Sequence, residues 1–368
     1  MRNECSQSAA IDGVVKGAAR RELARALFAM LLGCGTCAVW GANLSVELIS
    51  HPGGDTDTAV ETSVTGINDQ GIAIGYSTGA KDSTKHVPAF GLPFIYEHKT
   101  FLELKPPLYN NGIDEVRPVS INNHNQVLVY RNRTSTRQID YFLYDMAQDT
   151  FRVLGNRIHL SSAPNVSDVR LGGISAMNDN GVVIAHFSGH VHDSTLLQSH
   201  VVAGIAFGKP ILGPAGSIAR PTEEAEFTPI PGCPSGGTMT VTGINAQNQI
   251  SGYCQNRRYK PTYAAISAFV YADGQFTEIV EPTAIVTVAT AINNHGVAAG
   301  WYQVRNTDIY RSFIYRGSSI LQETWPPNAH GNTPKYVRAL GINDSGQLVG
   351  EVQGGSLNGF LAIPPPAH

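Results

Sequence analysis

The stretch GINDQGIAIGYS, residues 66–77, has the pattern of a hairpin: one strand ends, Asp-Gln-Gly forms a turn, and a second strand begins. The same phrase returns near the other end of the chain as GINDSGQLVGEV, residues 341–352. Four further copies lie between them, so the chain contains six copies of one repeat. Each copy carries an Asn at the same place: Asn68, Asn122, Asn178, Asn245, Asn293 and Asn343.

A residue suited to a left-handed backbone follows three positions after each repeated Asn. It is always Gly or Asn, the residue types that accept a positive φ most readily: Gly71, Asn125, Gly181, Asn248, Gly296 and Gly346. A short loop that ends in such a residue joins antiparallel strands as a tight hairpin. An Asn side chain before the turn can bond to the turn's own backbone. We therefore interpret the six repeated Asn as structural turn residues and not as a ring of polar ligands.

The blocks between the turns complete a repeating unit. An aromatic strand follows each hairpin, as in PFIYEH (93–98), YFLYDM (141–146) and SFIYRG (312–317), and a further short strand often comes next. Successive repeated Asn are 48 to 67 residues apart. Four short strands in about 50 residues match a propeller blade, which must stack on its neighbours to bury both faces. The sequence predicts an all-β fold: a six-bladed β-propeller with four-stranded blades.

Two regions depart from the regular unit. The third unit has VVAGIAFGKPILG (201–213) in place of its last two strands, and an insertion at 213–239 follows, which we expect to cover one side of the central opening. The last unit ends at GFLAI (359–363) and lacks a fourth strand. The segment LSVELIS (44–50) resembles the fourth strands of other units, so we expect this N-terminal strand to close the last blade and remove an exposed edge.

The repeated pattern can be compared with a known family. Ile-Asn, two variable residues, Gly, and then an aromatic strand such as SAFVY (267–271) or RSFIY (311–315) resembles the HAF-type extracellular repeat family over roughly residues 60–363. The His-Ala-Phe of that name is present here in relaxed forms. The resemblance implies a bacterial exported protein and carries no catalytic assignment.

The first 42 residues have the outline of a secretory signal. Arg20, Arg21 and Arg25 precede an apolar run that is too short for a comfortable transmembrane helix, and small residues follow. Two processing routes are open: LLGC (31–34) resembles a lipobox with Cys34 as the lipidated residue, or signal peptidase cuts near 38–42. We predict a propeller domain over 43–368 that is extracellular or periplasmic and has no transmembrane helix.

Export changes the interpretation of the cysteines. In an oxidising compartment Cys233 and Cys254 favour a disulfide over two buried thiols, and neither belongs to the CxxC motif of a zinc knuckle. The formal net charge of the chain is −3, and removal of the basic leader makes the remainder more acidic. The charge balance therefore argues against a nucleic acid as partner.

Function should be sought where the repeats differ. The loops between the second and third strands are basic and contain tyrosines: Arg131, Arg133, Arg137, Arg257, Arg258, Lys260, Arg305 and Arg311, with Tyr259, Tyr263, Tyr302 and Tyr310 among or beside them. Arginine pairs with carboxylate or phosphate, and aromatic faces stack on sugars. If the blades close, these loops converge on one rim that suits an acidic glycan, an envelope polymer or another exported protein. The alternative interpretation is that the charges serve solubility.

A second candidate is AHFSGHVHDSTLLQSH (185–200). If this segment is a strand, His186, His190 and His192 point to one side, where imidazoles suit a transition metal; the alternative is a loop with scattered histidines. Glu223, Glu224 and Glu226 of the insertion could act as acids. No nucleophile elbow, phosphate-binding Gly loop or HExxH occurs, and no cofactor is expected. We predict a non-catalytic binding propeller; the alternative is a secreted polysaccharide hydrolase or lyase with a loop-built active site.

Overall fold

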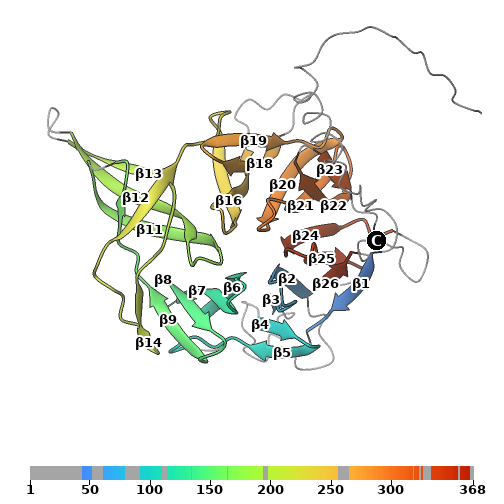
Figure 1. The fold of residues 1–368 in the computed structure, drawn as a ribbon, viewed down its shortest axis with the longest axis horizontal. Coiled ribbons are helices and arrows are strands. Elements are labelled where there is room, and N and C mark those ends of the chain that lie inside the picture. Colours follow the sequence, from blue (N-terminus) through green and yellow to red (C-terminus); the bar gives the residue numbers. More distant parts are fainter. Residues whose placement is uncertain are drawn as a thin grey trace, which may run out of the picture. The chain divides into compact units, whose positions relative to one another are not determined.

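The computed structural model describes residues 44–51, 61–78, 92–109, 114–133, 135–163, 165–193, 198–255, 265–317, 319–322, 325, 333–354 and 357–364. All of these residues lie in one compact unit, Trp40–Pro366. They form strands and turns and no helix (Figure 1), so the prediction of an all-β protein is confirmed. It follows that the described ranges include no helix that could span a membrane. The leader at 1–42, with Cys34, lies outside them.

Each repeated Asn lies in the turn of an antiparallel hairpin, as the sequence predicted. The six hairpins pair β2 (Glu61–Ile67) with β3 (Ala73–Thr78), β6 (Asp114–Ile121) with β7 (Gln126–Arg133), β11 (Val166–Met177) with β12 (Val183–Asp193), β16 (Thr238–Ile244) with β17 (Ile250–Gln255), β20 (Ala284–Ile292) with β21 (Ala298–Val304), and β24 (Val337–Ile342) with β25 (Leu348–Gln353).

A third strand pairs with the second strand of every hairpin. These third strands are β4 (Leu92–Glu97), β8 (Gln138–Asp145), β13 (Gln198–Gly208), β18 (Ile266–Ala272), β22 (Tyr310–Arg316) and β26 (Leu357–Ile363). The outer strands are β5 (Thr100–Glu103), β9 (Thr150–Leu154), β15 (Ala225–Ile230), β19 (Gln275–Ile279), β23 (Ser319–Gln322) and β1 (Ser45–Ile49). The fourth and fifth units share one parallel contact, Ile266 opposite Val286, and so count as one eight-stranded sheet.

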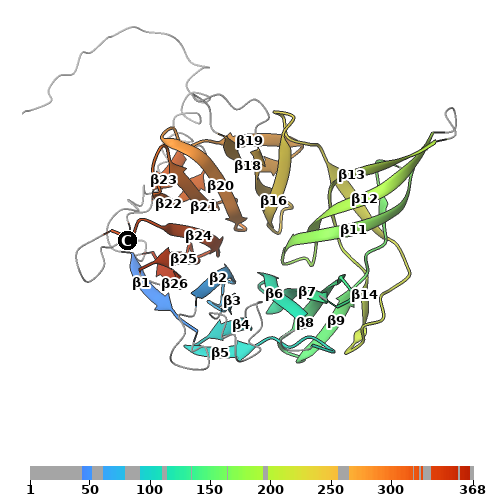
Figure 2. The same cartoon turned by 180° about the vertical axis from the view of Figure 1, so that it is seen from behind.

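The N-terminal strand belongs to the last sheet. β1 pairs antiparallel with β26 from Ser45 opposite Ile363 to Ile49 opposite Gly359, and the sheet order is β1-β26-β25-β24 (Figure 2). The expectation that this segment supplies the missing strand is confirmed. The pairing covers the outer edge of β26, and β1 becomes the outer strand of this sheet.

The third unit corrects the sequence prediction. The segment after β13 does not continue the same sheet: β14 (Leu212–Ala215) pairs with β9 of the preceding sheet. In return β10 (Ile158–Leu160), which follows β9, pairs in parallel with β15, a strand of the insertion. Two neighbouring sheets thus exchange outer strands and have five strands each, so the prediction of four-stranded units is wrong there. The insertion is bound into these sheets because its strands find partners in both.

The core explains one column of the repeat. Phe94, Phe269 and Phe360 of the third strands are buried, and each lies opposite a glycine of the second strand. At Gly75 an added Cβ would lie 2.2 Å from the Ser63 carbonyl and 2.7 Å from the Phe94 ring. The second strand therefore carries a small residue where the phenyl ring of the third strand packs across it.

Candidate functional site

The repeated Asn holds its own turn and the next one. In the fifth unit Oδ1 of Asn293 accepts hydrogen bonds from the backbone N–H groups of His295 and Val297, both at 3.0 Å. Its Nδ2 donates to the Asn343 carbonyl at 3.0 Å, in the turn of the following unit. The Asn293 side chain is buried, as are Val297 and Asn343. Both ends of the amide are used inside the protein, which agrees with a structural role.

The same contacts pass through all six turns and return to the first. Nδ2 of a repeated Asn donates to the carbonyl of the next repeated Asn at five junctions: Asn68 to Asn122, Asn178 to Asn245, Asn245 to Asn293, Asn293 to Asn343, and Asn343 to Asn68. Between the second and third units the link is made by Asn123 N–H, which donates to Asp179 at 2.8 Å. The turns therefore form one closed set of hydrogen bonds.

Five of the six residues that follow a repeated Asn have an acid or amide side chain and form a second ring: Asp69, Asn123, Asp179, Asn294 and Asp344; the sixth is Ala246. These five line a cavity of about 110 Å³ to which all six first strands contribute. Asn123 Nδ2 donates to Asp69 at 2.5 Å and to Asp179 at 3.0 Å, and Asn294 Nδ2 donates to Asp179 at 2.8 Å. Burial raises the pKa of Asp69, and the neighbouring charge of Asp344 raises it further against the lowering by the Asp344 backbone N–H. The cavity is smaller than the roughly 300–1,000 Å³ of ordinary ligand pockets.

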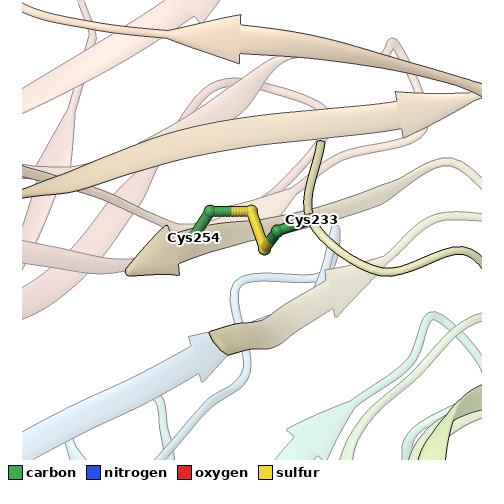
Figure 3. Close-up of a disulfide and its surroundings, with 2 residues drawn as sticks. All are labelled: Cys233 and Cys254. Carbon is green, nitrogen blue, oxygen red and sulfur yellow. A yellow bond between two sulfur atoms is a disulfide. The ribbon is translucent and has the colours of Figure 1, made fainter. Parts of the chain in front are cut away.

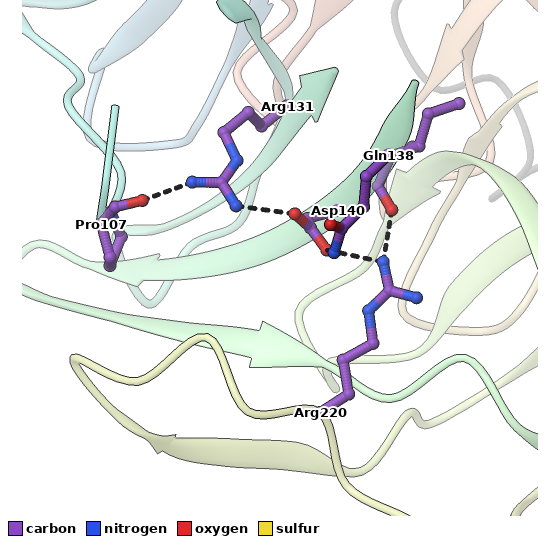
Figure 4. Close-up of polar contacts among 6 residues, drawn as sticks. Pro107, Arg131, Gln138, Asp140 and Arg220 are labelled. Carbon is purple, nitrogen blue, oxygen red and sulfur yellow. Dashed lines mark hydrogen bonds and ion pairs between the residues drawn. The ribbon is translucent and has the colours of Figure 1, made fainter. Parts of the chain in front are cut away.

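Among the described residues, three arginines of the predicted basic rim bind other groups of the protein. Arg131 is fully buried, and its guanidinium binds the Pro107 carbonyl and, at 2.6 Å, the Asp140 carboxylate (Figure 4). Arg220 of the insertion reaches the other oxygen of Asp140, also at 2.6 Å. Burial alone would raise the pKa of Asp140, but the two guanidinium groups hold it below its ordinary value. The prediction that Arg131 lies on a ligand-binding rim is wrong because an acidic partner and a second arginine enclose it.

Other members of that set differ in their surroundings. Arg311 donates to the Tyr310 and Pro334 carbonyls at 3.0 and 2.9 Å, and Arg305 donates to the Ala284 carbonyl at 3.1 Å, so backbone groups engage both. Arg137 is exposed and Arg133 is half-buried. The remaining members lie outside the described residues: Arg257, Arg258, Tyr259, Lys260 and Tyr263.

The histidine segment is a strand, which is the first of the two interpretations. His186 and His190 are exposed on one side of β12; His192 lies on the same strand, but its side chain is outside the described part. Within the described ranges, no three His, Cys, Asp or Glu side chains are grouped so as to hold a metal. Glu223, Glu224 and Glu226 are exposed, and Glu224 pairs with Arg157 at 3.2 Å. The described side chains therefore include neither an assembled metal site nor a buried group of acids.

The predicted disulfide is formed. Cys233 and Cys254 are bonded, with their Cα atoms 6.0 Å apart (Figure 3). Both are buried, and the bond joins the end of the insertion to the end of β17. It fixes the insertion to the fourth unit at the end of the strand that is farther from the Asn245 turn.

A group of aromatic and charged side chains lies between the fifth and last units. We call Trp301, Tyr310, Tyr336, Arg338 and Glu351 the Trp301 cluster. Ring centroids of Trp301 and Tyr310 are 5.7 Å apart, and those of Tyr310 and Tyr336 are 5.0 Å apart. The Arg338 guanidinium lies over both outer rings, 5.2 Å from Trp301 and 4.6 Å from Tyr336. The three rings are partly exposed, so they present both apolar faces and polar groups to solvent.

The charges of the Trp301 cluster balance. Arg338 Nη2 donates to Glu351 at 2.7 Å, Tyr336 donates its hydroxyl at 3.3 Å, and Ser63 of the first unit donates to the other carboxylate oxygen at 2.6 Å. Burial, followed by the Glu351 charge, raises the pKa of Tyr336 to about 12. Glu351 is thus fully engaged and buried. Arg338 Nη1 meets no hydrogen-bond acceptor among the residues described, which leaves it available.

The position of this cluster follows from the repeats. Trp301 comes eight residues after Asn293, and Arg338 comes five residues before Asn343, so both lie toward the strand ends that are farther from the turns. That is the end where the sequence analysis placed function and where it named Tyr310. Trp301 was not among the predicted residues, although the sequence contains a signal for it. Five of the six residues eight positions after the repeated Asn have rings: Tyr76, Tyr130, His186, Tyr253 and Trp301, with Glu351 as the sixth.

A cavity of about 470 Å³ lies between the second and third units, on the turn side. The crossing segment Lys209–Leu212 contributes to its lining, and core side chains such as Leu154, Met177 and Val183 form its walls. This volume is in the range of small-molecule sites, but the walls are mostly apolar. Because a sugar needs many polar partners, we do not place a carbohydrate there.

Comparisons with known proteins find matches among solved structures. No family model matches the chain, and no curated protein is similar to it in sequence. Among solved structures, an oligogalacturonate lyase in complex with manganese has a TM-score of 0.41 and 10% identity, over 88% of this chain and 97% of that chain. A mutant Aleuria aurantia lectin in complex with Fucα1-6GlcNAc has a TM-score of 0.38 and 12% identity, over 84% of this chain and 98% of that chain. At such TM-scores neither likeness carries an argument about function.

Proposed function

We propose that this chain is an exported, non-catalytic carbohydrate-binding protein built as a six-bladed β-propeller. The six hairpins, the pairing of β1 with β26 and the closed set of turn contacts support the propeller. The disulfide and the leader-like first 42 residues support export, and the repeat pattern supports membership of the HAF-type family. Carbohydrate binding rests on the Trp301 cluster.

The Trp301 cluster carries the proposal because it combines what a sugar requires. The C–H faces of a sugar ring pack on partly exposed aromatic rings, and Trp301 and Tyr310 supply such rings 5.7 Å apart. Sugar hydroxyls accept and donate hydrogen bonds. The free Nη1 of Arg338 supplies a donor, and Tyr310 supplies a hydroxyl that can do both. Arg338 is held in place by Glu351 and by two aromatic rings, so little ordering is needed when the sugar binds.

The electrostatics of the cluster favour a neutral sugar. A Glu351 carboxylate 2.7 Å from Arg338 cancels its charge, so an anionic sugar gains little net attraction there. The acidic glycan proposed from the basic loops would require arginines that lie outside the described residues, such as Arg257 and Arg258. We therefore propose neutral glycans as ligands of the Trp301 cluster.

The test is binding of purified 43–368 to neutral and acidic oligosaccharides at low and high salt. The neutral probes are Fucα1-6GlcNAc and cello-, chito- and malto-oligosaccharides; the acidic probes are oligogalacturonates. We expect a neutral probe to bind with little dependence on salt, and Trp301→Ala to weaken it about tenfold through loss of stacking. The matched control is Tyr271→Ala, which removes a partly exposed ring from the turn side of the fourth unit.

Three results would overturn parts of the proposal. Failure of every probe to bind would refute carbohydrate binding. Binding that survives Trp301→Ala but not a change in the basic loops, together with strong salt dependence, would move the site to those loops and restore the acidic glycan. Conversion of a bound oligosaccharide to shorter products would refute the non-catalytic part and favour the hydrolase or lyase.

A further inference from the structure

The register of the repeats places a second aromatic and arginine pair in the molecule. Tyr76 comes eight residues after Asn68, as Trp301 does after Asn293, and Arg117 comes five residues before Asn122, as Arg338 does before Asn343. In both places the aromatic residue belongs to one unit and the arginine to the next. The two pairs therefore occupy equivalent positions at two different junctions of the repeat.

The second junction has the same kinds of contact as the first, although its carboxylate comes from the strand of the arginine itself. The Arg117 guanidinium lies 4.7 Å from the centroid of the Tyr76 ring, and its Nε is 2.8 Å from a Glu115 carboxylate oxygen. Tyr130 lies opposite Arg117 in the β6–β7 register, and its ring is 5.6 Å from that of Tyr141. We call Tyr76, Glu115, Arg117, Tyr130 and Tyr141 the Tyr76 cluster. Like the Trp301 cluster, it has aromatic rings, an arginine and a carboxylate that neutralises it.

The other junctions lack this combination. Five residues before the repeated Asn the six units have Ser63, Arg117, Gly173, Thr240, Val288 and Arg338. Arginine thus occurs at two of the six positions, and in both cases the unit before it supplies a ring to the guanidinium. If these arginines only packed the junctions together, we would expect an arginine at all six junctions. Because arginine occurs at two, we infer that it has a role in binding.

We propose that the protein is bivalent: the Trp301 cluster and the Tyr76 cluster each bind a stretch of neutral glycan. This inference rests on the proposed function. The clusters share no residue and come from different strands, β21, β22, β24 and β25 in one and β3, β6, β7 and β8 in the other. Each can therefore be occupied while the other is empty. A polymer that engages both gains avidity because its second contact is intramolecular.

The two clusters differ in openness. The Arg338 side chain is 28% exposed and its partner Glu351 7%, whereas the Arg117 side chain is 44% exposed and Glu115 17%. An exposed ion pair is held less firmly and is screened by salt. Binding at the Tyr76 cluster is accordingly weaker and more sensitive to salt than binding at the Trp301 cluster.

The test is calorimetric titration of purified 43–368 with a short oligosaccharide, together with capture on the matching immobilised polysaccharide. The probes are chitotetraose, cellotetraose, maltotetraose and Fucα1-6GlcNAc, each used if it binds. We expect two molecules per chain in the unmodified protein; in Trp301→Ala or Tyr76→Ala one molecule keeps its affinity and the second binds about tenfold more weakly. Capture on polysaccharide falls about tenfold in either variant, since the second contact is weakened.

The controls separate this inference from the proposed function. Tyr271→Ala should keep two sites and full capture. Arg117→Gln repeats the Tyr76 test with a smaller change if Tyr76→Ala alters thermal unfolding. One site that is weakened by Trp301→Ala and is unaffected by Tyr76→Ala and Arg117→Gln would overturn bivalency and leave the proposed function in place. Failure of every probe to bind would overturn both.

Discussion

The two ends of the strands in each hairpin differ in how much their residues vary from unit to unit. At the turns every unit has the same Asn, with the same bonds to its own turn and, at five of six junctions, to the next repeated Asn. At the far ends the equivalent positions hold different residues, such as Tyr253, Trp301 and Glu351. A side chain that must bond to its neighbour in the ring is constrained by that neighbour, whereas a side chain at the far end is free to vary. Uniform positions therefore hold the repeats together, and varied positions are where function can arise.

The difference is also energetic. On the turn side many similar hydrogen bonds stabilise the fold, and each contributes a modest part of the free energy of unfolding. The far side contains features that are not shared by all units: the enclosed Arg131, the Cys233–Cys254 bond and the Trp301 cluster. We expect single changes at these features to have larger effects on stability than single changes at the turns.

The largest expected effect comes from Asp140→Ala. This change leaves Arg131 buried without its carboxylate and removes the partner of Arg220. Loss of one partner of a buried ion pair costs about 3–5 kcal/mol. The measurement is the free energy of unfolding in urea, and the control is Arg137→Ala at an exposed position of the adjacent loop, which should change it by less than about 0.5 kcal/mol. Equal effects of the two changes would show that the charges of this region are solvated.

The disulfide should have the next largest effect. Its two cysteines are 21 residues apart, and cross-linking a loop of that size stabilises a protein by about 3 kcal/mol. Replacement of both cysteines by serine should lower the free energy of unfolding by that amount. Reduction of the unmodified protein provides an independent measurement of the same loss. If the double serine variant were as stable as the oxidised protein, the insertion would be fixed by its strands alone.

A single repeated Asn should matter less than either far-side feature. Asn293→Ala removes two acceptor bonds within the turn and one donor bond to Asn343, all near 3.0 Å. The buried backbone groups lose their partners, which costs about 2 kcal/mol. The control is His295→Ala in the same turn, because the His295 side chain is exposed and only its backbone is engaged. A loss above that of Asp140→Ala would reverse the comparison of the two sides.

The sequence predicted the features that depend on local chemistry. Gly or Asn three residues after each Asn specified the turns, and these residues have positive φ, for example 57° at Asn125 and 78° at Gly71. The match of residues 44–50 to other outer strands predicted the pairing of β1 with β26. Each of these inferences used a pattern that repeats along the chain, so one unit could be checked against another.

Features that depend on distant partners could not be predicted in this way. Arg131 was placed on the surface because a charge is usually exposed, but Asp140 neutralises it and Arg220, 80 residues farther along the chain, completes the network. The exchange of β10 and β14 depends on which sheets the chain passes, and neither strand resembles the repeat. The Trp301 cluster is an intermediate case. The ring-bearing position eight residues after the repeated Asn is visible in the sequence, but the contact between Arg338 and Trp301 is visible only in the folded structure.

The smallest expected effect concerns two neighbouring acids on the turn side. In the second ring Asp344 precedes Asp69, and Asp69 Oδ1 accepts the Asp344 N–H at 2.7 Å. Burial raises the pKa of Asp69 and the Asp344 charge raises it further. A carboxyl with a raised pKa in the folded state binds its proton more tightly there than in the unfolded chain. Its contribution to stability is therefore complete at pH values below the unfolded pKa and is lost as the pH rises through the folded pKa.

Asp344→Asn should flatten this pH dependence. The substitution removes the neighbouring charge but not the burial of Asp69, so the raised pKa falls only in part. Between about pH 4 and pH 7 the unmodified protein should lose about 0.5 kcal/mol more of its unfolding free energy than the variant, as expected for an exposed charge pair. Because Asn at 344 also alters the bond from Asn294, the informative quantity is the slope with pH and not the stability at one pH. Parallel curves for the two proteins would mean that the two carboxylates do not interact.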